Sequence, residues 1–236
     1  MSRLELVQHE FDDSETLART FARETADALR EAIAARGHAL IALSGGNTPR
    51  RFLERLGEQQ LDWARTTITL ADERWVPPDN ARSNEHLLRE TLLRGNAGAA
   101  HFVSLHVDTP TPEQGLAVVA ERIANLVMPF DVVVLGMGDD GHCASLFPDG
   151  DNLQAALNPL GELRVMPMRA PDAPEPRITL TLAALIRTRR MYLQIEGETK
   201  GRLFARIRDG DPAFSDAPVR SVLEHSHVVP IVLHCR

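Results

Sequence analysis

The segment VVVLGMGDDGHCASLFP, residues 132–148, places an acid and a histidine directly after an apolar run. Histidine is the side chain whose ordinary pKa lies nearest to neutral pH, and a nearby carboxylate can hold its ring in one tautomer. Asp140 and His142 are therefore candidates for acid–base chemistry. A histidine that only makes hydrogen bonds within its own turn is an equally ordinary interpretation.

The same segment contains the letters G-x-G-x-x-G at Gly136, Gly138 and Gly141, a spacing also found in dinucleotide-binding loops. In those loops a helix begins within the glycines, and an acidic residue follows about 20 positions later. Neither feature is predicted here, and Asp139 and Asp140 would repel a pyrophosphate. The segment is therefore interpreted as a loop that presents side chains and not as a nicotinamide-nucleotide site.

A second glycine turn, in LSGGNTPRR, lies between a predicted strand and a predicted helix. Asn47 or Thr48 can cap that helix, and Pro49 suits its first turn. The free N–H groups and the dipole of a helix start attract anions, and Gly45 and Gly46 let a phosphate approach the backbone. The turn is thus a candidate anion site, although an ordinary strand–helix turn fits the spacing equally well.

A third strand end, in LADERW, carries Asp72, Glu73 and Arg74. An adjacent guanidinium keeps a carboxylate ionised and can itself bind an anion. An ion pair within a loop is the more ordinary interpretation of these residues taken alone. Trp75 is expected to be a hydrophobic anchor.

Metal and nucleophile motifs are absent from the sequence: it contains no H-E-x-x-H, C-x-x-C or G-x-S-x-G. His225 and His227 have no identifiable partners for chelation, so no metal is expected. Cys143 is expected to be a small buried side chain. The sequence contains two cysteines, Cys143 and Cys235. So few cysteines predict no disulfide framework and suit a reducing compartment.

Composition limits the classes of partner. The 236 residues carry a net charge of -7, with 43% apolar and 25% charged residues, which predicts a packed core and argues against nucleic acid as a partner. No apolar run approaches the roughly 20 residues that cross a bilayer, and no signal peptide is visible at the N-terminus. A cytoplasmic protein with no membrane partner is expected. Lysine occurs once, at Lys200.

Strand-like and helix-like patterns alternate along the chain, which predicts an α/β fold with a mostly parallel sheet and helices on both faces. The predicted strands cover residues 38–46, 66–74, 130–138, 190–197 and 228–235. The predicted helices cover residues 12–37, 83–94, 111–127 and 199–210, with another after Pro49. Met166–Arg177 is predicted to be a loop or extended segment, and Pro230 indicates an edge or an end of the last strand. A single domain over residues 1–236 is expected, with ligands at the carboxyl ends of strands.

Four blocks together resemble the 6-phosphogluconolactonase family, in order and over nearly the whole chain. They are LSGGNTPRRFLERL, LADERWVPPDNARSNEHLLRETLL, DVVVLGMGDDGHCASLFPD and RITLTLAALIRTRRMYLQIEGETKGRLF. The wider superfamily includes glucosamine-6-phosphate deaminase. The resemblance implies a three-layer Rossmann-like fold and hydrolysis of 6-phospho-D-glucono-1,5-lactone to 6-phosphogluconate, in the oxidative pentose phosphate pathway. It also implies that no cofactor is needed.

The resemblance further implies roles for individual residues. His142 matches the family's catalytic histidine, which activates water, and Asp140 lies where it can orient the imidazole. Asp72 matches an acid of the sugar pocket. Positions that hold phosphate or sugar oxygens are matched by Ser44, Gly45, Gly46, Asn47 and Thr48, by Arg74 and Lys200, and more loosely by Arg177.

Two alternatives of different class stay open. In the deaminase, a glutamate follows the histidine by five residues, whereas Phe147 stands there in this chain, which favours the lactonase. A sugar-phosphate-binding regulator on the same fold would carry a DNA-binding module, and no helix-turn-helix precedes the first predicted strand. The expected partner is a small sugar-phosphate lactone, and the expected assembly is a monomer or a weak homo-oligomer.

Overall fold

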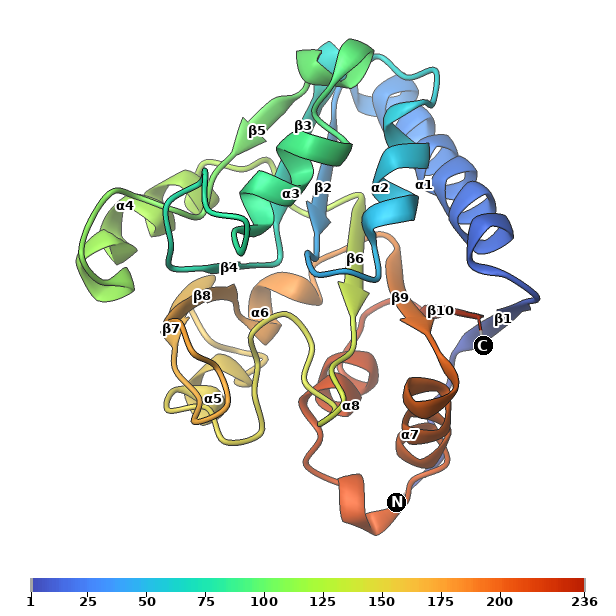
Figure 1. The fold of residues 1–236 in the computed structure, drawn as a ribbon, viewed down its shortest axis with the longest axis vertical. Helices are drawn as coiled ribbons and strands as arrows, with labels where there is room; N and C mark the ends of the chain where they lie inside the picture. Colours follow the sequence, from blue (N-terminus) through green and yellow to red (C-terminus); the bar gives the residue numbers. More distant parts are fainter. Residues whose placement is uncertain (1, 236) are drawn as a thin grey trace.

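The computed structural model describes residues 2–235, and its central feature is a sheet of seven parallel strands (Figure 1). Their order is β1-β10-β9-β6-β2-β3-β5. The strands are β1 Val7–Phe11, β2 Ala39–Leu43, β3 Thr66–Leu70, β5 His101–Val103, β6 Val132–Gly136, β9 Met191–Glu196 and β10 Ile231–Cys235. The mostly parallel α/β fold predicted from the sequence is confirmed.

Helices pack around this sheet (Figure 1). They are α1 Ser14–Arg36, α2 Arg50–Gly57, α3 Asn84–Thr91, α4 Pro112–Ala124, α5 Leu153–Ala156, α6 Leu182–Leu185, α7 Glu198–Arg208 and α8 Pro218–Glu224. All five residues of β2 are buried, and because neighbouring strand residues point to opposite faces, both faces of the sheet are covered there. Over residues 2–235, no helix combines the length and apolar character needed to span a membrane.

The longest helix begins and ends where the sequence predicts. Asp13 caps α1, because its Oδ1 atom accepts a hydrogen bond from the Thr16 N–H at 2.8 Å. Gly37 ends the helix with a φ of 80°. Only glycine adopts that left-handed conformation at little cost, so the stop is set locally.

A second, antiparallel sheet differs from the prediction. It joins β4 Asp72–Arg74, β8 Arg177–Leu180 and β7 Val165–Met168 in that order. The predicted strand 66–74 is therefore two strands in two sheets, since β3 ends at Leu70. The segment Met166–Arg177, predicted to be a loop or extended, is extended at its two ends, in β7 and at the start of β8, and forms a loop between them. The proline inside β7 is tolerated because β7 is an edge strand.

The edges of the large sheet were also not predicted. β10 lies between β1 and β9, so the edge interpretation of Pro230 is wrong and this residue marks the start of the strand. β1 and β5 form the two edges. Their residues are intermediate or exposed, so neither strand carries the continuous apolar signal of a buried strand.

The strand order reverses between β2 and β6. From β2 the chain proceeds to β3 and β5 on one side, and from β6 to β9 and β10 on the other. Open parallel sheets bind ligands at the carboxyl ends of strands at such a reversal. The two glycine turns of the sequence follow β2 and β6, and both therefore lie at this point.

Candidate active site

A cavity of about 420 Å³ lies at the carboxyl ends of β2 and β6. Its wall is built from the turn after β2, the β4 segment, the segment that leads into α3, the end of β6 and the loop after it, the loop before β8, and single residues of β9 and α7. The structure brings together the following predicted residues in that wall: Ser44, Gly45, Gly46, Asn47, Thr48, Asp72, Arg74, His142, Arg177 and Lys200. Asp140 stands behind His142 and contacts it directly.

The loop after β6 closes into a tight turn that presents an imidazole. The Gly138 N–H donates to the His142 carbonyl at 2.9 Å. The Asp140 Oδ1 atom lies 2.5 Å from His142 Nδ1 and also accepts the His142 backbone N–H at 3.0 Å. With Nδ1 directed at a carboxylate, Nε2 is the ring atom left to exchange protons.

The charge of Asp140 is supported by the same contacts. Burial disfavours its ionised form, but hydrogen bonds from the His142 ring and backbone outweigh burial and hold the pKa of Asp140 below its ordinary value. The carboxylate therefore remains negative at neutral pH and holds the imidazole through Nδ1. This is the arrangement that general acid–base chemistry requires.

Two glycines of the G-x-G-x-x-G run serve this turn. A Cβ atom on Gly138 would lie 2.1 Å from His142 Cε1, so the imidazole packs directly against the glycine. Gly141 has a φ of 81°, which a side chain would strain. The imidazole also contacts Phe147, with 4.6 Å between ring centroids. The glycines therefore position a side chain rather than a pyrophosphate.

Asp72 is 6% exposed and held by two side chains from other segments. Ser145 Oγ donates to its Oδ2 atom at 2.5 Å. Asn84 Nδ2 donates to its backbone oxygen at 2.9 Å and lies 3.4 Å from its Oδ1. These contacts fix the carboxylate at the cavity wall.

Four cations line the cavity: Arg74, Arg82, Arg177 and Lys200. Arg74 Nη1 donates to the Arg82 carbonyl at 2.6 Å, and Arg82 is paired with the Glu175 carboxylate. Burial lowers the pKa of the Arg177 guanidinium, which lies 5.6 Å from the Phe147 ring centroid. Such a group of donors suits a phosphate or another anion.

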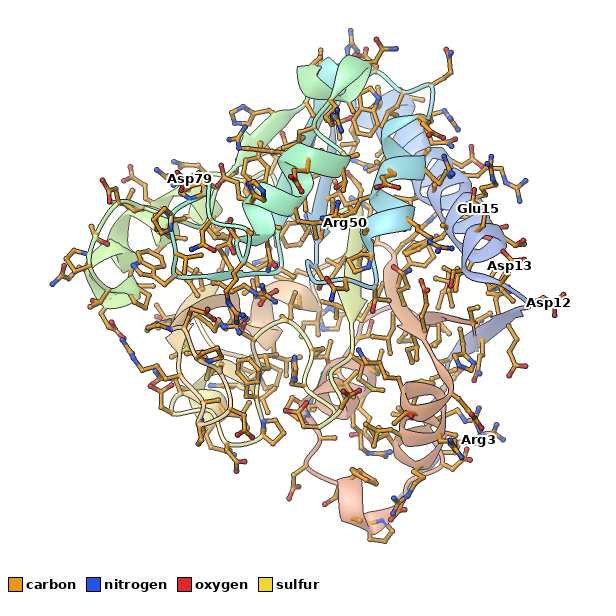
Figure 2. The ribbon with its side chains drawn as sticks, viewed as in Figure 1. Arg3, Asp12, Asp13, Glu15, Arg50 and Asp79 are labelled. Atoms are coloured by element: carbon orange, nitrogen blue, oxygen red, sulfur yellow. The ribbon has the colours of Figure 1, made fainter. Side chains whose placement is uncertain are left out.

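The turn after β2 reaches the cavity without the predicted cap. Pro49 already has helical angles, φ −78° and ψ −4°, and α2 begins with no side-chain cap hydrogen bond. Asn47 and Thr48 are therefore not caps, and both line the cavity instead. Arg50, labelled at the start of α2 in Figure 2, pairs with Glu90 at 3.4 Å.

The other residues singled out by the sequence lie outside the cavity. Trp75 is 8% exposed and donates to the Thr109 carbonyl at 2.8 Å, as expected of an anchor. Cys143 is fully buried, which raises the pKa of its thiol. His225 contacts the Ser221 carbonyl at 2.9 Å. Among the residues that the structure places, no three His, Cys, Asp or Glu side chains form a group that could hold a metal ion.

Glu73 is structural rather than part of the cavity wall. Its carboxylate is fully buried and accepts four hydrogen bonds, from the Ser83 hydroxyl and from the backbone of Arg74, Asn84 and Glu85. Burial raises the pKa of Glu73 to about 7 against the effect of these donors. The residue fastens the start of α3 to β4.

The polar residues that line or support the site and that sequence reasoning missed include four with partners elsewhere in the chain: Arg82, Asn84, Ser145 and Gln194. Gln194 Nε2 lies within 3.3 Å of the Thr48 carbonyl and 2.7 Å of Glu196 Oε1. Each of the four acquires its role through a partner far away in the chain. The only local signal was Ser83, a helix cap that places Asn84 at the start of α3.

The sequence profile of the family described as "Glucosamine-6-phosphate isomerases/6-phosphogluconolactonase" matches residues 12–230. The 6-phosphogluconolactonase of Rhizobium meliloti (strain 1021) is 43% identical over 219 residues, which cover 92% of this chain and 94% of that protein. The 6-phosphogluconolactonase of Pseudomonas aeruginosa (strain PAO1) is 46% identical over 183 residues, 78% of this chain and 77% of that protein.

Solved structures agree with this similarity. A crystal structure of a 6-phosphogluconolactonase from Shewanella baltica OS155 superposes with a TM-score of 0.93 at 38% identity, covering 98% of both chains. A monomeric glucosamine-6-phosphate deaminase reaches a TM-score of 0.79 at 19% identity, over 98% of both chains, and so shares the fold alone. This chain therefore belongs to the glucosamine-6-phosphate isomerase/6-phosphogluconolactonase family.

Proposed function

We propose that the chain hydrolyses 6-phospho-D-glucono-1,5-lactone to 6-phospho-D-gluconate, in the oxidative pentose phosphate pathway, with His142 as general base. Its relatives at 43% and 46% identity make it an enzyme of the 6-phosphogluconolactonase type. The observation that carries the role of His142 is its 2.5 Å contact with Asp140 at the wall of a cavity that four cations also line. The proposed reaction uses water and needs no cofactor.

The proposed mechanism follows from the orientation of the imidazole. His142 Nε2 takes a proton from water, whose oxygen attacks the lactone carbonyl carbon. The tetrahedral intermediate then collapses, the bond between that carbon and the ring oxygen breaks, and the imidazolium returns its proton to the departing ring oxygen. Asp140 keeps Nδ1 protonated throughout and stabilises the positive ring between the two transfers.

Substrate binding is proposed to use backbone groups, cationic side chains and one carboxylate of the cavity wall. The backbone of residues 44–48, with Arg74 and Lys200, holds phosphate or sugar oxygens, and Arg177 adds a buried positive charge. Lys200, in the first turn of α7, supplies a compact ammonium suited to a phosphate oxygen. Asp72 is proposed to accept a sugar hydroxyl, since its carboxylate is fixed at the wall.

The deaminase alternative is disfavoured by Phe147. That reaction would need a second acid beside the histidine, and the position is occupied by an aromatic ring packed 4.6 Å from the imidazole centroid. A regulator would bind the sugar phosphate without turnover. One assay separates the three: purified protein with freshly prepared lactone and, separately, with glucosamine-6-phosphate, above the spontaneous opening of the lactone. Turnover of the amino sugar alone would overturn the proposal.

Replacement of the proposed base is the direct test of mechanism. His142→Ala should lower kcat roughly 10²–10⁴-fold, the usual contribution of a general base. His225→Ala is the matched control, because that histidine contacts the Ser221 carbonyl and lies outside the cavity wall. Full activity in His142→Ala, with an unchanged circular dichroism spectrum, would remove the general-base role.

A further inference from the structure

Asn84 is a buried amide that connects two parts of the cavity wall, the β4 segment and the turn after β2. It is the first residue of α3 and is 2% exposed. Its side chain lies between Asp72, to which Nδ2 donates, and Gly45 of the turn after β2. A Cβ atom on Gly45 would lie 2.0 Å from Asn84 Oδ1 and 2.2 Å from Cγ, so only glycine leaves room for the amide.

The orientation of this amide is determined by its partners. Both contacts of Nδ2 are with oxygen atoms of Asp72, at 2.9 Å and 3.4 Å, so the NH₂ group must point toward Asp72. The Oδ1 atom then faces the Gly45 side. No donor within residues 2–235 hydrogen-bonds to Oδ1, which leaves it as an acceptor in the cavity wall.

The backbone beneath Asn84 is held as firmly as its side chain. Glu73 Oε1 accepts the Asn84 N–H at 2.7 Å, and Glu73 Oε2 accepts the Glu85 N–H at 2.8 Å. The start of α3 is thereby attached to β4, the strand that also carries Asp72. Asn84 therefore has little freedom to turn its amide when a ligand enters.

We propose that Asn84 determines specificity by accepting a hydrogen bond from a ring hydroxyl of the substrate through Oδ1. The proposal rests on the lactonase function proposed above. A phosphate dianion offers only acceptors, so it cannot supply the hydrogen bond that this oxygen lacks. A hydroxyl supplies the missing donor, and a substrate lacking it leaves a buried acceptor unpaired, which proteins discriminate strongly.

Substrate deletion tests this recognition. The wild-type protein and Asn84→Ala are assayed with the 6-phosphogluconolactone and with its 2-, 3- and 4-deoxy analogues, prepared fresh from the deoxy sugar phosphates. In the wild type, kcat/KM should fall about tenfold or more for the analogue without the recognised hydroxyl. In Asn84→Ala that discrimination should shrink to less than about threefold for this one analogue, while the ratios for the other two stay unchanged.

A second experiment tests the placement of the amide. Gly45→Ala should lower kcat/KM about tenfold or more, because the new Cβ displaces the Asn84 side chain. In the Asn84→Gly background the same substitution should cost less than about threefold, since the atoms it would meet are gone. Asn84→Gly is used because the Asn84 Cβ itself would lie 2.8 Å from the added atom.

Gly46→Ala is the matched control for this cycle. It lies in the same turn and would meet nothing within 4 Å, although its φ of 92° strains any side chain. Its cost should be the same with and without Asn84. Circular dichroism and thermal unfolding of each variant exclude misfolding.

The outcomes separate the two proposals. A wild-type protein inactive on the lactone overturns the proposed function, and this inference with it. An active wild type whose Asn84→Ala variant loses activity in parallel on all four lactones overturns the role of Asn84 alone. The role of Asn84 is also overturned if Gly45→Ala lowers kcat/KM equally in the wild type and in the Asn84→Gly background.

Discussion

Two glycine turns flank the reversal in strand order, residues 44–49 after β2 and residues 137–142 after β6, and each holds a polar side chain against the backbone of a glycine. In each turn one glycine admits a polar side chain against its backbone, and another adopts a positive φ. In the turn after β6 the admitted side chain is His142, which belongs to the turn itself. In the turn after β2 it is Asn84, which arrives from α3.

The difference teaches which sites are local. The turn after β6 carries its own carboxylate and imidazole and only needs a backbone that folds back, which Gly138 and Gly141 permit. The turn after β2 contributes mostly backbone, and its polar environment depends on α3, β4 and β9. The turn after β6 thus carries its own chemical groups, whereas the turn after β2 is completed by residues from other segments.

The largest effect is expected from a substitution that disrupts the turn after β6. Gly138→Ala would place a Cβ atom 2.1 Å from His142 Cε1 and 2.8 Å from Asp140 Oδ1, which forces the imidazole out of position. The activity lost should approach that of His142→Ala, roughly 10²-fold or more in kcat/KM, and the double variant should be little worse than either single one. Steady-state kinetics with the lactone measure this.

Gly136→Ala is the control within the same segment. A Cβ atom there would meet nothing within 4 Å, so we expect a much smaller loss. Equal losses in the two glycine variants would contradict the idea that Gly138 exists to admit the imidazole.

The next prediction concerns the non-local turn, through the residue that fixes α3. Burial raises the pKa of Glu73 from 4.5 to about 7. Between these values the folded protein retains a proton that the unfolded chain has lost, so stability falls as pH rises, by up to about 1.4 kcal/mol per pH unit. Glu73→Gln removes this titration. The unfolding free energy of the wild type relative to the variant, from urea titrations, should therefore decline from pH 4.5 to pH 7.

If the difference in unfolding free energy between the wild type and Glu73→Gln stays constant from pH 4.5 to pH 7, the raised pKa of Glu73 is contradicted. Activity gives an independent check, because Glu73 holds the backbone of Asn84. If the start of α3 loosens in Glu73→Gln, discrimination between the lactone and its deoxy analogues should weaken, while the His142–Asp140 pair in the other turn is unaffected.

The same local and non-local division explains what could be predicted from the sequence. Asp140 and His142 could be proposed as a pair from the sequence because the two residues and the strand that precedes them are contiguous, and the structure places them in contact. Ser145 and Gln194 were missed because their partners, Asp72 and the Thr48 carbonyl, come from distant segments. Pairing across such distances is decided by sheet register, and no spacing rule within one segment reveals it.

The helix cap predicted at Asn47 or Thr48 was wrong because of the conformation of the next residue, Pro49. Asn47 and Thr48 are good caps by propensity, but Pro49 adopts helical angles, and the Arg50 N–H bonds to the Asn47 carbonyl at 3.3 Å. The turn tightens before the helix begins, so neither side chain can reach the positions that a cap would bond. The predicted strands followed their burial: β6 was predicted from a continuous apolar run and β2 and β9 from mostly apolar segments. The edge strands β1 and β5, whose residues are intermediate or exposed, carried no such signal.

The smallest expected effect compares the two glycines of positive φ. Gly46 has a φ of 92°, and a Cβ atom added to it would lie in open space, so Gly46→Ala should cost only the left-handed strain, about 1–2 kcal/mol. Gly141 has a φ of 81°, and its Cβ atom would also lie 3.2 Å from Ala217 Cβ and 3.4 Å from Ile207 Cδ1. Gly141→Ala should therefore destabilise the protein more, since the segments around Ala217 and Ile207 must shift as well. Urea unfolding at one pH compares the two free energies. Equal costs would mean that the packing around the turn after β6 yields freely, and that backbone conformation alone explains the glycine in both turns.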